Sequence, residues 1–439
     1  MRFFDRTKEI EALRNIRVLS EQNAQFTVVT GRRRIGKTNL VWKAYEDRPF
    51  LYFFVTKKAE TDLCESYIYE IEQKLGIPML GRADRFADIF EYVLKLSEKR
   101  PITLFIDEFQ RFSNVNKSIY GDMQRIWDMY EKSAHINLIV CGSIYSMMIR
   151  LFRDKDQPLY GRQTRFLHVK AFTPSVLKEI ISEYNPNYTN DDLLALYTFT
   201  GGVAKYVQLL MDAGAFTKEL MIEEMVRPDS IFIDEGKAML IEEFGSDYGV
   251  YFSIMSAISR GVTTRSKIEQ LLNKEIGGYL TNLEREYELI SKKQPMFSRT
   301  ERTNILYCID DNFLMFWFRF IYKYNYILEI AGYDKVRQII ERDYNTFSGI
   351  MLERYFKEVL VERNEYTRLD RWWDRKGENE IDLIAENELD DTAVFFEIKR
   401  KKENIKLDIL KEKSQMFLKS TGQFRNYQIS YDALSIDDM

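Results

Sequence analysis

An octapeptide near the N-terminus carries residue types that bind a nucleoside triphosphate. It runs Gly31-Arg32-Arg33-Arg34-Ile35-Gly36-Lys37-Thr38 and follows the β-branched run 25–30, which predicts a strand. The backbone N–H groups of such a loop and the N-terminus of the next helix donate to phosphate oxygens. Lys37 would neutralise the β- and γ-phosphates, and the Thr38 hydroxyl would ligate Mg²⁺. The spacing predicts a site for a nucleoside triphosphate with Mg²⁺, and we expect ATP.

The remaining positions of the loop have simpler tasks. Gly31 and Gly36 let the backbone curl close to the phosphates. The arginines at 32–34 either reach the ligand or form solvated tips of the loop, and the second reading is favoured. The nucleotide-binding set that we expect from this segment is Gly31, Arg34, Ile35, Gly36, Lys37, Thr38 and Asn39.

A second apolar run, 102–106, ends in two carboxylates, Asp107 and Glu108. Burying carboxylates costs free energy unless something polar lies at the strand tip. Asp107 would hold the Mg²⁺ shell, and Glu108 would orient and deprotonate the attacking water. The alternative is an ordinary strand end with acids in solvent, which the neighbouring phosphate loop disfavours.

Two further residues follow the apolar run 137–141. Ser143 could contact the γ-phosphate or the water, or it could be a simple turn residue. Arg162 could stabilise charge in the transition state, or it could form a surface salt bridge.

Short apolar strands alternate with helical patterns over the first 170 residues. The strands are expected at 25–30, 51–55, 102–106 and 137–141, and helices at 61–75, 85–97 and 123–133. This alternation predicts a parallel sheet buried on both faces, so residues 1–170 form an α/β ATPase core.

The rest of the chain divides into four predicted parts. Short helices broken at Gly201-Gly202 predict a helical lid over 171–245. Three helices followed by a two-stranded ribbon predict a winged helix over 246–311. An aromatic linker helix spans 312–340, and helix and strand patterns alternate again over 341–439. The fold class is therefore a multidomain α/β protein.

The ordered motifs of the first half resemble those of the archaeal-type ATPase family, within the wider AAA+ and signal-transducing (STAND) ATPases. They are GRRRIGKT, LFIDEFQ, LIVCGS, PLYGR ending at Arg162, and Thr200-Gly201-Gly202-Val203. The resemblance covers about residues 1–230 and implies a helical lid and a switch-like or oligomer-coupled ATPase. Val203 and Ala204 stand where the family usually has proline.

The last hundred residues place carboxylates on two predicted strands. In 393–399, Glu397 and Lys399 share one face, and in 380–385 Asp382 lies opposite an apolar face. If the strands are neighbours, Asp382 meets Glu397 with Lys399 alongside. Such oxygen ligands suit Mg²⁺ or Mn²⁺, which would activate water while Lys399 stabilises the growing charge. The alternative is a surface ion-pair strand.

This spacing, Asp-x₁₄-Glu-Ile-Lys after a helix with Glu353, resembles the PD-(D/E)XK nuclease superfamily. It also resembles the C-terminal domain that often follows archaeal-type ATPases. The resemblance implies a restriction-endonuclease-like domain over 341–439, with Asp382 and Glu397 as metal ligands, Lys399 as the catalytic lysine and Glu353 as an auxiliary acid. Ile381 stands where the pattern's name has proline.

Composition limits the partners. The chain has 439 residues, 64 basic and 68 acidic, with a net charge of −4, so any nucleic-acid surface is a local patch. The run 399–402 offers cations for a phosphate backbone, and the alternative is a solvated charge run. Three scattered cysteines and two histidines exclude a disulfide framework and an ordinary zinc site. A charged N-terminus lacks a signal peptide's apolar core, and charges interrupt the apolar stretch 313–330. We expect a cytoplasmic protein without membrane contact.

Two functions remain in view. In the first, an ATPase couples its nucleotide state to DNA binding or Mg²⁺-dependent DNA cleavage by the C-terminal domain. In the second, a regulatory ATPase switch binds DNA or a protein partner through its winged helix and C-terminal domain without cutting. A homo-oligomer is compatible with both.

Overall fold

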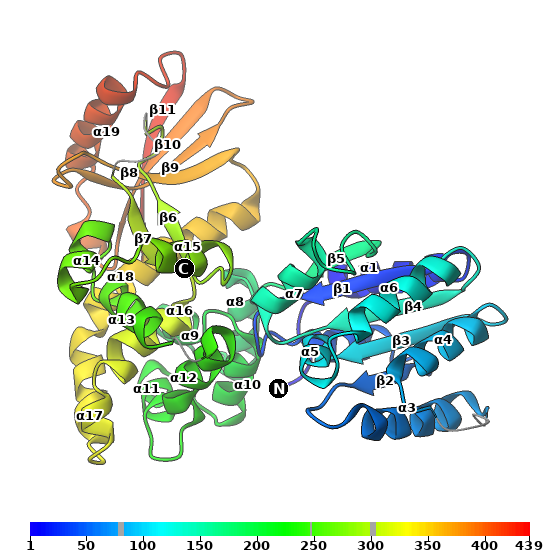
Figure 1. Ribbon diagram of the computed structural model, residues 1–439. Coiled ribbons are helices and arrows are strands. Elements are labelled where there is room, and N and C mark those ends of the chain that lie inside the picture. The colour runs from blue at the N-terminus through cyan, green and yellow to red at the C-terminus, as the bar shows by residue number, and fades with distance from the viewer. Residues whose placement is uncertain (78–82, 246–247, 299–303) are drawn as a thin grey trace. The chain divides into compact units, whose positions relative to one another are not determined.

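The computed structural model describes residues 1–77, 83–245, 248–298 and 304–439. The chain forms two compact units, one of residues 5–170 and one of residues 1–4 with 171–439 (Figure 1). The predicted ATPase core corresponds to the first unit, whereas the predicted lid, winged helix, linker and C-terminal block all belong to the second. Among the described residues, no helix is long and apolar enough to cross a membrane.

The first unit is built on a five-stranded sheet in the order β2-β3-β4-β1-β5. All four pairings are parallel, as predicted. The strands are β1 (Gln25–Thr30), β2 (Leu51–Phe54), β3 (Ile102–Asp107), β4 (Ile136–Cys141) and β5 (Arg165–His168). Four of them were expected from their apolar runs. The fifth, β5, was missed because its two end residues are exposed and no apolar run marks it.

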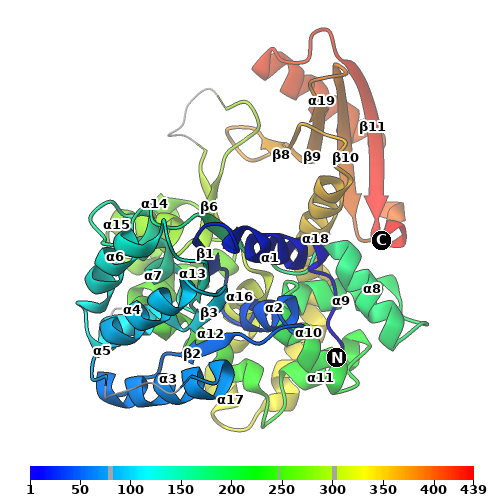
Figure 2. The same ribbon diagram turned by 90° about the vertical axis from the view of Figure 1, so that its right-hand side faces the viewer.

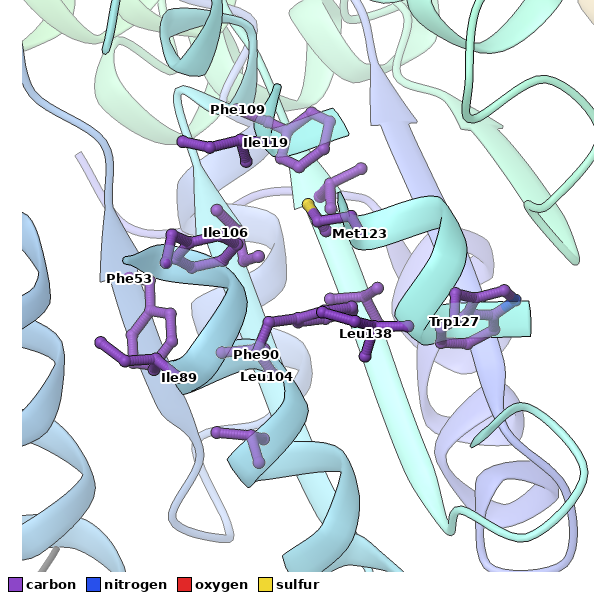
Figure 3. Packing of buried hydrophobic residues seen from close by; sticks show 14 of the residues in the cluster. Phe53, Ile89, Phe90, Leu104, Ile106, Phe109, Ile119, Met123, Trp127 and Leu138 are labelled. Carbon is purple, nitrogen blue, oxygen red and sulfur yellow. The ribbon is translucent and has the colours of Figure 1, made fainter. Parts of the chain in front are cut away.

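Helices cover both faces of this sheet. They are α1 (Thr7–Ser20), α2 (Lys37–Ala44), α3 (Glu60–Leu75), α4 (Phe86–Ser97), α5 (Phe112–Val115), α6 (Ile119–Tyr130) and α7 (Tyr145–Arg153), with a 3₁₀ turn η1 (Phe109–Arg111). Side chains from α3, α4, α6 and α7 form one hydrophobic cluster with the strands. Figure 3 shows Phe90 of α4 and Trp127 of α6 packed beside Leu104 and Leu138 of the central strands. This packing fixes the strand ends that carry the polar residues.

The second unit opens with a helical block. It comprises α8 (Pro174–Tyr184), α9 (Asn190–Thr200), α10 (Ala204–Asp212), α11 (Lys218–Met225) and α12 (Ile231–Phe244). The paired glycines separate α9 from α10, as expected. Gly202 has φ of 71°, and a Cβ there would lie 2.2 Å from the carbonyl oxygen of Phe172. Only glycine therefore fits this close backbone approach.

Three helices and an antiparallel ribbon follow, in the predicted order. They are α13 (Tyr248–Ser259), α14 (Arg265–Leu272), α15 (Gly277–Arg285), β6 (Ile290–Lys293) and β7 (Leu306–Ile309). The predicted boundary at residue 246 and part of the expected turn, residues 299–303, lie outside the described residues.

The predicted aromatic helix is interrupted. It consists of α16 (Asn312–Phe316), a π-helical segment η3 (Trp317–Tyr322) and α17 (Asn325–Leu328). A single long helix, α18 (Tyr333–Arg363), then runs through residue 341, where the sequence suggested a boundary. Buried residues occur along the whole of α18, so no break in packing separates its two halves.

A four-stranded sheet in the order β11-β10-β9-β8 ends the chain (Figure 2). Its strands are β8 (Arg368–Trp373), β9 (Glu380–Asn387), β10 (Thr392–Lys399) and β11 (Gln428–Ser435), and α19 (Leu407–Thr421) precedes β11. Strands β8, β9 and β10 pair antiparallel, whereas β11 pairs parallel with β10. Helix α19 packs on the sheet through Phe417, whose ring lies 5.6 Å from that of Phe395.

The segment that follows β6 docks on this sheet. Met296 donates its backbone N–H to the Arg371 carbonyl oxygen of β8 at 2.9 Å. Its side chain is 3% exposed and belongs to the same hydrophobic cluster as Trp372 and Phe417. The guanidinium of Arg368 lies 4.8 Å from the ring centroid of Phe297. The ribbon therefore supplies part of the core of the C-terminal sheet, which sequence periodicity did not reveal.

This docking predicts the effect of truncating Met296. Met296→Ala leaves a cavity in the C-terminal core and should lower the free energy of unfolding of this unit by about 2–5 kcal/mol. Hydrogen exchange of residues 368–399 should rise in parallel. Met416→Ala on α19 is the matched control, because Met416 is 48% exposed. Equal exchange in both variants would show that the ribbon does not stabilise the sheet.

Candidate functional site

The phosphate loop joins β1 to α2 and curls around its own lysine. Gly31 has φ of 145°, and a Cβ there would lie 2.5 Å from the Val169 carbonyl oxygen. Gly36 has φ of 94° and is the N-cap residue that precedes α2. The Lys37 ammonium donates to the carbonyl oxygens of Gly31 at 2.8 Å and Arg32 at 2.9 Å. The loop is thus held as a compact turn with its lysine buried.

Thr38 and Asp107 meet although 69 residues separate them. The Thr38 hydroxyl donates to Asp107 Oδ2 at 2.8 Å. The Tyr52 hydroxyl of β2 donates to the same oxygen at 3.2 Å, a contact that the sequence did not indicate. Burial raises the pKa of Tyr52, and the negative charge of Asp107 adds to the rise, so Tyr52 stays a neutral donor. Two hydroxyl groups therefore orient one carboxylate oxygen.

Glu108 lies next to this carboxylate in a left-handed backbone conformation, with φ of 56°. Its Oε2 accepts from Ser143 Oγ at 2.9 Å and from Gln110 Nε2 at 2.9 Å. Arg111 Nε pairs with the same oxygen at 3.0 Å. The structure thus brings Ser143 within hydrogen-bond distance of Glu108, whereas its contact with the γ-phosphate or the attacking water stays a prediction.

The other predicted nucleotide contacts are placed less uniformly. Ile35 is buried and packs beneath the loop against Gly31, whereas Asn39 is exposed. Arg34 has φ of 64° in the loop itself. Arg162 precedes β5 and forms two hydrogen bonds to Asp128, at 3.2 and 3.1 Å. It therefore lies at the amino edge of the parallel sheet, a strand length of about 20 Å from the loop, and the structure does not bring it to the phosphate site.

A parallel sheet whose first strand leads into this loop, with Asp-Glu at the end of β3, defines a P-loop nucleoside triphosphate-binding protein. A family model described as an ATPase domain predominantly from Archaea matches residues 3–210. A second model, described as archaeal and bacterial proteins of unknown function, matches residues 317–414.

Similar proteins agree with this class. An uncharacterised protein of Methanocaldococcus jannaschii is 32% identical over 91% of this chain and 88% of its own length. An uncharacterised ATP-binding protein of the same organism is 22% identical over 56% of this chain and 82% of its own. A Walker-type ATPase of Pyrococcus abyssi has a similar fold, with a TM-score of 0.54 at 18% identity, over 72% of this chain and 96% of that one. Residues 3–210 therefore carry an ATPase domain of the archaeal type, and the whole chain belongs to one family with the first of these Methanocaldococcus jannaschii proteins.

The C-terminal carboxylates meet around a lysine. The Lys399 ammonium lies 2.8 Å from Asp382 Oδ2 and 3.2 Å from Glu397 Oε1. Burial would lower the pKa of Lys399, but the two carboxylates outweigh it and raise that pKa. Glu397 is 5% exposed, and its Oε2 is buried without a hydrogen-bond partner. The antiparallel pairing of β9 with β10 thus produces the juxtaposition that strand alternation predicted.

Glu353 lies on the edge of this group. Its carboxylate pairs with Arg371 at 4.0 Å, and Arg371 also pairs with Glu380. Burial raises the pKa of Glu353 to about 7, and the negative charge of Asp382 adds to that effect. Among the residues that the structure describes, no three carboxylate, imidazole or thiol groups are arranged to hold a metal ion. Lys399 lies between the Asp382 and Glu397 carboxylates, whereas Glu353 pairs with Arg371.

Arg400 turns inward rather than joining a basic surface. Its guanidinium donates to Asp191 Oδ1 of α9 at 2.6 Å and to Ser348 Oγ of α18 at 2.7 Å. Lys218 of α11 pairs with the other oxygen of Asp191 at 2.9 Å. Two cations thus share one carboxylate and tie the helical block to the strand end that carries Lys399. The sequence had placed Arg400 among cations for a phosphate backbone.

This cluster predicts a pH-dependent contribution to stability. Burial would raise the pKa of Asp191, but Arg400 and Lys218 outweigh it and lower that pKa below 3.8. A depressed carboxyl pKa stabilises the fold at pH values above the unfolded-state pKa and loses that contribution as pH falls through the folded-state value. Asp191→Asn should therefore lower the free energy of unfolding by about 1.5–3 kcal/mol at neutral pH.

Urea unfolding at pH values from about 2 to about 7 measures this contribution, because an aspartate carboxyl group titrates within that range. The difference from the wild type should shrink once the pH falls below 3.8. Asp408→Asn is the control, because Asp408 is 98% exposed in its pair with Lys411. A deficit in Asp191→Asn that is independent of pH would contradict the ion-pair explanation.

Proposed function

We propose that the chain hydrolyses ATP at the phosphate loop with Mg²⁺, and that the contact between Thr38 and Asp107 marks the cation site. The donor set fits the ion, since a hydroxyl and a carboxylate oxygen 2.8 Å apart are hard oxygen ligands. Thr38 and Asp107 would hold Mg²⁺, which supplies charge neutralisation at the β- and γ-phosphate oxygens.

The chain's own residues perform the remaining steps. Lys37 leaves the loop carbonyls and neutralises the β- and γ-phosphates. Glu108 accepts a proton from the attacking water, and Ser143 orients the Glu108 carboxylate through its hydroxyl. The support for these roles is that Lys37, Thr38, Asp107, Glu108 and Ser143 converge at the carboxyl edge of one sheet, where ligands of open α/β sheets bind.

Two substitutions separate binding from hydrolysis. Lys37→Ala should weaken ATP binding at least about 100-fold because the phosphates lose their main cation. Glu108→Gln should bind ATP normally and hydrolyse it at least about 100-fold more slowly, because the general base is lost. Calorimetric titration and phosphate release measure the two effects. Lys43→Ala, an exposed lysine on α2, is the control. Unchanged affinity in Lys37→Ala would overturn the assignment.

A second activity is favoured by one observation in the C-terminal sheet. The unpartnered buried oxygen of Glu397 points to a ligand that completes the pair with Asp382. We propose that these two carboxylates hold Mg²⁺ or Mn²⁺, with Glu353 as an auxiliary acid, in a nuclease-like site. The ion would supply an activated water. Lys399 then stabilises the charge that grows on a DNA phosphodiester.

The helical block supports control of this site by nucleotide state. It directly follows the ATPase unit in the chain and contacts α18, where Tyr197 donates to Glu358 at 2.7 Å. Asp191 holds Arg400, the neighbour of Lys399, so movement of the block changes the position of that strand end.

The three helices and ribbon have the order of a winged helix, but their contacts favour a structural role over DNA binding. Arg265 pairs with Glu269 at 2.7 Å and Lys292 with Glu284 at 2.5 Å, so these cations are already neutralised. The ribbon also docks on β8. DNA would therefore reach the protein at the C-terminal sheet. The alternative to a nuclease is a regulatory ATPase switch that binds DNA or a protein without cutting.

Incubation with plasmid and single-stranded DNA in Mg²⁺ or Mn²⁺ separates these functions. Nicking should occur in the wild type and disappear in Asp382→Asn and Lys399→Ala, because the site loses a metal ligand or its charge-stabilising lysine. Lys411→Ala on α19, whose side chain is 52% exposed, should cut normally. Binding without cleavage at excess protein would establish the switch. Nicking that survives both substitutions would come from another source.

A further inference from the structure

The side-chain amide of Gln110 contacts both Glu108 and Ser143 in the ATPase unit. It lies in η1, two residues after Glu108, and is 1% exposed. Its Nε2 donates to Glu108 Oε2 at 2.9 Å and to Ser143 Oγ at 3.3 Å. Ser143 Oγ donates to the same Glu108 oxygen at 2.9 Å. Three side chains thus form a closed triangle of hydrogen bonds.

The chemistry of the triangle determines the direction of each bond. An amide nitrogen has two protons and a hydroxyl has one, whereas a carboxylate only accepts. Gln110 can therefore serve Glu108 and Ser143 together, while Ser143 accepts from Gln110 and donates to Glu108. The reversed amide would place its oxygen against the carboxylate, so only one orientation satisfies all three groups.

The surroundings hold the amide in place at a cost. The backbone carbonyl oxygen of Gln110 accepts from Ser113 Oγ at 2.8 Å and from the Tyr120 hydroxyl at 3.1 Å, so the backbone of this residue is fixed. A Cβ on Gly142 would lie 2.2 Å from Gln110 Oε1, and that oxygen is buried without a hydrogen-bond partner. An unmade hydrogen bond in the interior costs about 1–3 kcal/mol. An apolar residue of this size would avoid that cost and still fill the space.

We propose that Gln110 is a positioning residue for ATP hydrolysis, which aligns the Glu108 carboxylate with Ser143. This inference rests on the proposed role of Glu108 as general base. Gln110 does not touch the nucleotide; it limits the directions in which Glu108 can accept a proton. Loss of that alignment slows the chemical step and leaves ATP binding intact, because displacement of a catalytic group by about 1 Å costs on the order of 100-fold in rate.

Gln110→Met in the full chain tests the proposal, because methionine matches glutamine in length and lacks the donor. The kcat should fall about 10–100-fold while the KM and Kd for ATP stay within about twofold of wild type. In the Ser143→Ala background the same substitution should cost less than it does alone, because the two residues orient one carboxylate. Gln73→Met, an exposed glutamine on α3, is the control and should be unaffected.

Two outcomes overturn the inference. One is a Gln110→Met kcat within twofold of wild type, and the other is a loss that appears in KM and Kd as much as in kcat. If Gln110→Met fails to fold, Gln110→Asn decides, since its amide falls short by one carbon–carbon bond of about 1.5 Å and should lose kcat alone. Glu108→Gln keeps the two hypotheses apart. Full activity in Glu108→Gln would contradict the proposal that Glu108 is the general base. An inactive Glu108→Gln together with a fully active Gln110→Met would contradict only the proposed role of Gln110.

Discussion

The hydrogen bond between Thr38 and Asp107 is the contact around which the ATPase unit is arranged. One residue begins the helix after β1 and the other ends β3, with β4 between the two strands. Their approach depends on parallel pairing in one register, which the buried apolar strands and the helices over them enforce. A shift of β3 by one residue would turn Asp107 to the other face of the sheet. The hydrophobic core therefore determines whether the nucleotide site exists.

Beside this contact, the polar groups divide into two sets with different tasks. Tyr52 and Thr38 orient Asp107, whereas Ser143, Gln110 and Arg111 orient Glu108. Adjacent residues in the chain are thus supplied with separate donors, so the two carboxylates are oriented independently of each other. The left-handed backbone at Glu108 is the local reason, because it turns the two carboxylates in different directions.

The second unit joins parts that the sequence presented as separate domains. Met296 of the ribbon enters the core of the C-terminal sheet, and Arg400 at the end of β10 binds Asp191 of the helical block. The long helix α18 crosses the expected boundary at residue 341 without a break. The helical block is consequently joined to the strand end with Lys399 by ion pairs and hydrogen bonds rather than by a linker.

The sequence by itself determined the phosphate loop, the Asp107-Glu108 pair, four of the five parallel strands and the strand faces that carry Asp382 and Glu397. Each depends on contiguous residues or on strand alternation, which are local properties. The tertiary structure alone decided that Tyr52 and Gln110 serve the two carboxylates, that Arg162 lies at the far edge of the sheet and that Arg400 is buried in an ion pair. These contacts join residues whose spacing carries no periodic signal, because only the packing of whole elements brings them within hydrogen-bond distance.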